Sequence, residues 1–83
     1  MDFNQWLDTF VQEKELDKDQ EFFVEHNGNT HFIELGVVLM LCKKTNKEQQ
    51  ESIKKTIVKL DFYNADVTNF FEHLAKAYVH SKY

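Results

Sequence analysis

The chain has 83 residues, of which 42% are hydrophobic, 14% aromatic and 29% charged, and its net charge is −4 at pH 7. So much bulky apolar material excludes an intrinsically disordered chain, and this length gives one domain with a thin margin of stability. Because there is no proline and only two glycines, residues 1–83 are expected to form a single domain of regular elements without linkers.

The charge is unevenly distributed along the chain. Residues 1–34 carry nine acidic residues and two lysines, whereas residues 35–83 carry five acidic residues and eight lysines. All ten basic residues are lysine. Together with the many Phe and Asn residues, this bias points to an AT-rich genome, bacterial or phage.

The expected location is the cytoplasm. The sequence opens MDFNQW, without the basic segment and long apolar stretch of a signal peptide. The single cysteine, Cys42, cannot form an internal disulfide and lies in an apolar run, where a free cysteine acts as a small hydrophobe. Both features favour a reducing compartment.

The first predicted element is a helix that ends near Lys14. Asp2 is placed to cap it, with Gln5 in the capping-box position three residues later. Apolar residues then follow a 3.6-residue period on one face, namely Phe3, Trp6, Leu7, Phe10 and Val11.

A β-hairpin is predicted next, in the segment EFFVEHNGNTHFIEL. Asn27-Gly28 tolerates the positive φ angles of a type I′ turn, and Gly28-Asn29 is the alternative loop. Period-two alternation groups Phe22 with Val24, and Ile33 with Leu35, as an inner face that helices must cover. The opposite face, directed outward or toward another element, then holds Phe23, Glu25 and Phe32.

Three roles are considered for the apolar run LGVVLMLC, residues 35–42: a part of the core, a membrane anchor, or an interface with a partner. It is about half the length that spans a bilayer, so we expect no membrane insertion. A helix over residues 36–45 is favoured because Lys43 and Lys44 suit a helix C-terminus, although the β-branched Val37 and Val38 leave a third strand open. A helix that is apolar on every side is buried, so we expect a central core element, with a dimer interface as the alternative.

Two further helices complete the chain. Thr45 and Glu48 form a candidate capping box for a helix that ends near Leu60, and Asp66 is the candidate cap of the last helix. The inward residues are expected to be Ile53, Ile57 and Leu60 in the former, and Val67, Phe70, Phe71, Leu74 and Tyr78 in the latter. The predicted class is α+β: one antiparallel hairpin packed against about four helices, in the order α-β-β-α-α-α.

The sequence gives no support for an enzyme, a cofactor or a metal site. The four histidines lack the spacing of a zinc site. The alternating acidic residues from Asp17 begin like a calcium loop, but Phe22 stands where the loop needs glycine and Gly28 where it needs glutamate. Cys42 lies in an apolar run, and there is no glycine-rich phosphate loop.

The leading hypothesis is a non-enzymatic protein–protein interaction module of phage or mobile-element origin, with a homodimer as one form. An acidic surface steers association with basic protein surfaces. The candidate partner surface consists of Asp17, Asp19, Glu21, Phe23, Glu25 and Phe32.

The alternative hypothesis is weak nucleic-acid binding through a lysine face within residues 43–59. Clustered lysines gain affinity for phosphates through counterion release. The net negative charge, the interleaved Glu48 and Glu51 and the absence of arginine argue against it. The lysines concerned are Lys43, Lys44, Lys47, Lys54, Lys55 and Lys59.

Overall fold

Four helices and one two-stranded antiparallel sheet make up the computed structural model, which describes residues 2–60 and 63–83. The elements are α1 (Phe3–Glu13), β1 (Glu21–His26), β2 (Asn29–Glu34), α2 (Leu35–Lys43), α3 (Lys47–Leu60) and α4 (Asn64–Lys82). The predicted α+β class and the order α-β-β-α-α-α are confirmed.

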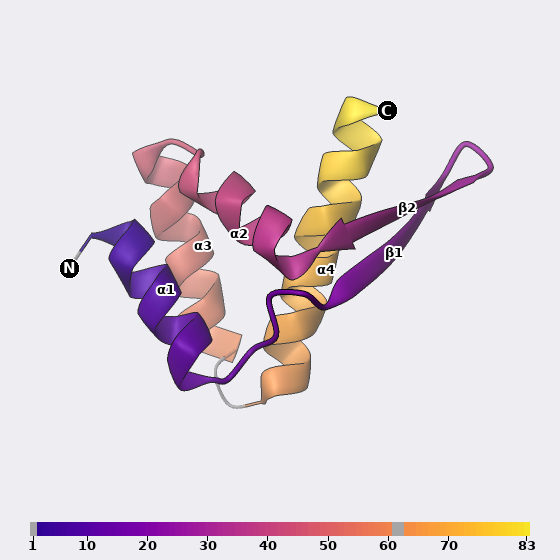
Figure 1. Cartoon of the computed structure of the whole chain (residues 1–83). Coiled ribbons are helices and arrows are strands. Elements are labelled where there is room, and N and C mark those ends of the chain that lie inside the picture. The colour runs from indigo at the N-terminus through magenta and orange to yellow at the C-terminus, as the bar shows by residue number, and fades with distance from the viewer. Residues whose placement is uncertain (1, 61–62) are drawn as a thin grey trace.

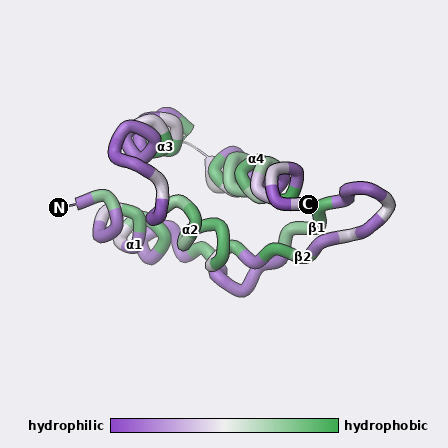
Figure 2. Tube along the Cα trace, turned by 90° about the horizontal axis from the view of Figure 1, so that it is seen from above, coloured by the Kyte–Doolittle hydropathy of each residue, from purple (hydrophilic) through white to green (hydrophobic). Residues whose placement is uncertain are grey.

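The helices and the hairpin are arranged in two layers. Seen from above, α1, α2 and the hairpin form one layer, and α3 and α4 form the other (Figure 2). Helix α2 crosses the middle of the molecule and contacts each of the other three helices. The hairpin crosses α4 and extends beyond it as an arm, at the opposite end of the molecule from α1 and α3 (Figure 1).

The hairpin has the turn that the sequence predicts. Asn27 and Gly28 both have positive φ angles, 53° and 79°, as a type I′ turn requires. Asn29 already begins β2 and pairs with His26, so the alternative Gly28-Asn29 loop is wrong. This register fixes which side chains share each face of the sheet.

The apolar run at residues 35–42 forms helix α2, so the alternative of a third strand is wrong. Four of its side chains are buried, namely Leu35, Val38, Leu39 and Cys42. They join a core built from α1, the inner face of β1, α3 and α4. Met40, however, is 48% exposed, so α2 is not buried on every side, and Figure 2 shows that it lies in one of the two layers rather than between them.

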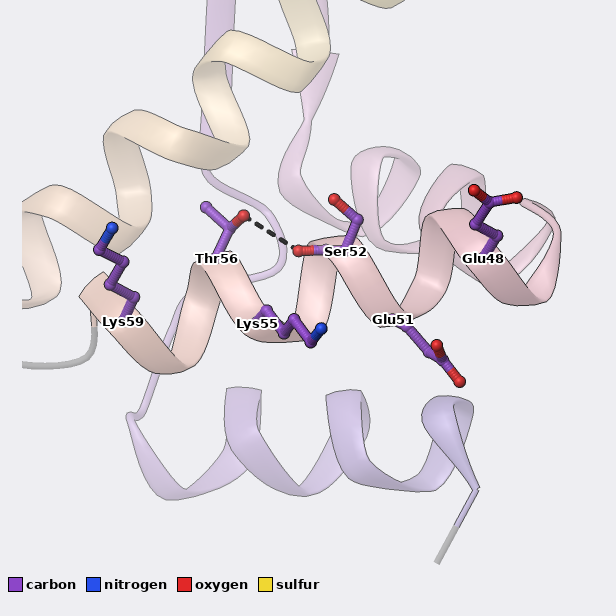
Figure 3. A pocket seen from close by; sticks show the side chains of 6 residues that line it. All are labelled: Glu48, Glu51, Ser52, Lys55, Thr56 and Lys59. Atoms are coloured by element: carbon purple, nitrogen blue, oxygen red, sulfur yellow. Dashed lines mark hydrogen bonds between the residues drawn. The ribbon is translucent and has the colours of Figure 1, made fainter.

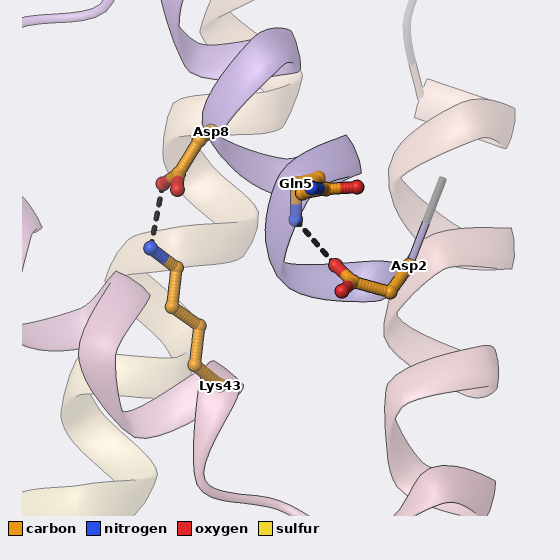
Figure 4. A network of polar contacts seen from close by, with 4 residues as sticks. All are labelled: Asp2, Gln5, Asp8 and Lys43. Carbon is orange, nitrogen blue, oxygen red and sulfur yellow. Dashed lines mark hydrogen bonds and ion pairs between the residues drawn. The ribbon is translucent and has the colours of Figure 1, made fainter.

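The start of α1 follows the sequence prediction. The Gln5 backbone N–H donates to Asp2 Oδ1 at 2.8 Å (Figure 4), which satisfies one of the free donors at the helix N-terminus. Burial of Leu7, Phe10 and Val11 confirms the predicted apolar stripe.

The start of α3 differs by one residue from the prediction. Asn46, rather than Thr45, caps the helix, since its Oδ1 accepts from the Gln49 N–H at 2.8 Å and its own N–H donates to Gln49 Oε1 at 3.4 Å. The Thr45 hydroxyl instead donates to the Cys42 carbonyl at 2.7 Å. Thr45 therefore satisfies a carbonyl at the end of α2. The capping box of α3 is formed by Asn46 and Gln49.

The start of α4 is also shifted. Its N-cap is Tyr63, and Asp66 lies in the first turn, where a carboxylate still interacts favourably with the helix dipole. Complete burial of Phe71, Ala75 and Val79 shows where α4 meets the core. No helix of residues 2–60 and 63–83 is long and apolar enough to cross a membrane.

Candidate functional site

The outer face of the hairpin gathers acidic and aromatic side chains. Alternate residues of paired strands share one face, and the pairs on this face are Glu21–Glu34, Phe23–Phe32 and Glu25–Thr30. All six residues are exposed. We call this surface the acidic aromatic face, defined as Glu21, Phe23, Glu25, Phe32 and Glu34, with Thr30 at its end near the turn.

Two phenylalanines form the centre of the acidic aromatic face. Phe23 is 62% exposed and Phe32 is 61% exposed. Their rings meet edge to face, with centroids 5.2 Å apart and planes at 88°, one of the favoured geometries for aromatic pairs. Since about 60% of each side chain is still exposed, complete burial would gain each phenylalanine a further 1–2 kcal/mol, roughly. The pair therefore leaves substantial apolar area in water.

The carboxylates on this face have no basic neighbour within it. Glu21 and Glu34 stand directly opposite each other, an arrangement in which like charges destabilise a strand pair. Glu25 lies on the other side of the phenylalanine pair, opposite Thr30. The face therefore repels anions, and a bound cation would relieve the repulsion between Glu21 and Glu34.

The inner face of the hairpin holds the arm in place. Phe22 and Val24 are buried in the core. Nearer the turn, the His26 and His80 rings lie 4.6 Å apart, and the His31 and Tyr83 rings stack at 4.5 Å. Because the end of α4 supports the hairpin from this side, the acidic aromatic face is not used to attach it.

Asp17 and Asp19 lie in a turn at the base of the hairpin, beyond the Glu21–Glu34 pair. The Asp19 N–H donates to Asp17 Oδ1 at 2.9 Å. The turn is joined to the start of α2, where the Leu35 N–H donates to the Gln20 carbonyl at 2.8 Å. Of the candidate partner surface, the structure thus brings together Glu21, Phe23, Glu25 and Phe32, with both aspartates outside the face.

The candidate lysine face is partly engaged within the molecule. Lys43 Nζ lies 2.6 Å from Asp8 Oδ1 and links α2 to α1 (Figure 4). Lys54 Nζ lies 5.3 Å from the centroid of the Trp6 ring, a cation–π contact. Lys47 opens α3, and Lys44 caps the end of α2.

The remaining two lysines share a shallow hollow along α3 with acidic side chains. Lys55 and Lys59 line it together with Glu48 and Glu51 (Figure 3). The Thr56 hydroxyl in the same hollow donates to the Ser52 carbonyl at 3.0 Å. Mixed charge of this kind weakens the attraction that a phosphate backbone needs.

Cys42 is buried, and the described residues hold no cluster that could bind a metal ion. Burial raises the pKa of the Cys42 thiol to about 11, so the thiolate needed for nucleophilic attack is scarce at neutral pH. Within residues 2–60 and 63–83, no three His, Cys, Asp or Glu residues lie together in a way that could hold a metal ion.

Sequence reasoning missed two features of this region. Glu34 completes the acidic aromatic face, and it could have been found by carrying the Asn27-Gly28 register to the far end of the hairpin, where it meets Glu21. The ring contacts of the hairpin with His80 and Tyr83 join segments that are far apart in the chain, so no local sequence pattern predicts them.

No family model matches the chain, and comparison with curated proteins and with solved structures gave no match.

Proposed function

We propose that the chain is a non-enzymatic, cytoplasmic protein-interaction module that binds its partner through the acidic aromatic face. The observation that carries the proposal is the pair of phenylalanines, each more than 60% exposed, on a face with three carboxylates and no basic residue. Exposed apolar groups surrounded by polar residues are typical of protein-binding surfaces. Aromatic residues also supply a large share of the energy at interfaces.

The charges of this face favour a different protein over a second copy of the chain. A twofold-symmetric dimer brings the same patch of both copies together. Such a dimer would bring the three carboxylates of one face against the three of the other, and like charges across an interface cost several kcal/mol. A partner with basic residues meets no such penalty.

The same charges support a protein partner more strongly than nucleic acid. Phosphates would be repelled by Glu21, Glu25 and Glu34. On the opposite end of the molecule, Lys43 and Lys54 are already paired with Asp8 and Trp6. Most lysines of the lysine face are therefore either held by a contact within the molecule or close to an acidic side chain, and few are available to bind phosphates.

Site-specific photocrosslinking in the native cells tests the proposal. A benzoyl-phenylalanine at position 32 should give a defined adduct with one partner protein, since this position lies at the centre of the face. The matched control is the same residue at position 58, where Val58 is 56% exposed on α3, and it should not give that adduct. Absence of an adduct from position 32, or the same adducts from both positions, would contradict the proposal.

A further inference from the structure

The edge of β2 is open to an additional strand. The sheet in the described part of the chain has two strands, so each strand pairs on one side only. No residue of β2 is buried, whereas Phe22 and Val24 of β1 are buried and α4 packs against β1, so β2 is the less covered of the two strands. An edge strand presents unpaired backbone N–H and C=O groups that can pair with another chain.

The side chains along this edge define what a third strand would need. Glu34 and Phe32 are alternate residues of β2 and both point to the outer face, about 7 Å apart along the strand. In an added strand, the residues opposite them would also be two positions apart and on the same face. A basic residue opposite Glu34 and an apolar residue opposite Phe32 would each form a favourable cross-strand pair.

The neighbouring strand strengthens this preference. Glu21 and Phe23 of β1 stand in the same two rows as Glu34 and Phe32. Neighbouring strands lie about 5 Å apart, so Glu21 stands about 10 Å from the added strand and adds to the negative charge around a cation at Glu34. An apolar group opposite Phe32 would meet the edge of the aromatic pair. Glu25 adds a third carboxylate on the other side of the pair.

We propose that the partner presents an extended basic segment, which joins β2 as a third strand and places Lys or Arg against Glu34 and an apolar side chain against Phe32. This inference rests on the proposed function and adds the chemistry and the geometry of the partner. Backbone pairing supplies affinity in such strand addition, and the alternating side chains supply specificity.

Peptide probes test the inference with the purified chain. The probe is a capped peptide of about seven residues, within the usual range of strand lengths. Lys and Val alternate at every second position, with Thr between them, so that Lys and Val lie two residues apart on the same face. Its first control has Glu in place of Lys, and its second control keeps Lys but carries N-methyl groups on alternate backbone nitrogens. Binding is followed by NMR through the backbone amide shifts of the ¹⁵N-labelled protein.

The Lys–Val peptide should shift the amides of β2 and those of β1 across from it. The variant Glu21→Gln/Glu25→Gln/Glu34→Gln should bind about tenfold more weakly, because each exposed charge pair contributes a few-fold. The variant Glu13→Gln/Glu48→Gln/Glu51→Gln removes the same charge from exposed positions elsewhere and should bind like the wild type. The N-methylated peptide should lose binding, since it cannot complete the backbone hydrogen bonds.

Three results would overturn the inference: no shift with the Lys–Val peptide up to about 5 mM, equal binding of the Glu–Val peptide, or equal binding of the N-methylated peptide. Self-association of the chain that Glu34→Lys abolishes would also overturn it, by making a second copy the occupant. A crosslink from position 32 alongside any of these results would leave the proposed function standing. Loss of that crosslink would remove both.

Discussion

Val38→Asp is expected to leave the chain unfolded, whereas Met40→Asp, two residues later in α2, is expected to fold. Val38 is 1% exposed and Met40 is 48% exposed. An unpaired charge in the core costs several kcal/mol. The whole stability of a chain of this size is on the order of 4–12 kcal/mol, toward the low end for a small core. At position 40 the same charge stays in contact with water.

Far-UV circular dichroism and urea unfolding of the two variants measure this contrast. Met40→Asp serves as the control for the added charge and for the low helix propensity of aspartate, because both variants share them. A cooperative transition of Val38→Asp at the wild-type urea midpoint would show that α2 is not a core element.

Phe71→Ala is expected to be the most destabilising truncation in α4. Phe71 is completely buried, and Phe-to-Ala changes in cores cost about 3–5 kcal/mol through lost transfer energy and the cavity that remains. Phe70, its neighbour, is only partly buried and packs at the edge of the core. Phe70→Ala should therefore cost less than half as much.

Thermal unfolding of the two variants provides the comparison. The melting temperature of Phe71→Ala should fall by about 15 °C or more, since 1 kcal/mol corresponds to about 4–8 °C in a domain of this size. Equal losses for both variants would mean that α4 is rotated from the orientation described.

Much of the fold could be predicted because local signals agreed with one another. The Asn27-Gly28 turn, the Asp2 cap and the 3.6-residue stripe of α1 each depend on residues close in sequence. The lysines that follow the apolar run, Lys43 and Lys44, favoured a helix at residues 36–45 but left a third strand open, and the structure has a helix at Leu35–Lys43.

The errors arose where neighbouring residues offered equivalent signals. Two overlapping pairs fit a capping box, Thr45 with Glu48 and Asn46 with Gln49. The structure has the second pair, because the Thr45 hydroxyl is hydrogen-bonded to the end of α2. The expected burial of α2 on every side was also only partly right. A sequence gives the hydrophobicity of Met40 but does not say how many layers cover it.

The candidate site followed from the alternation of side chains in the hairpin. The alternation places Phe23, Glu25 and Phe32 on one face, but only the tertiary structure shows that these side chains are exposed. The contacts of Lys43 with Asp8 and of Lys54 with Trp6 could not be inferred from the sequence, because each contact joins two different elements.

The central claim is that the acidic aromatic face lies outside the core and is free for a partner, and urea unfolding of Phe23→Thr/Phe32→Thr tests it most directly. Threonine keeps the strand preference, so the change removes the aromatic pair and little else. The structure predicts a loss of less than about 1.5 kcal/mol, the value of an exposed aromatic pair. A loss as large as that of Phe71→Ala would place these rings in the core and contradict the claim.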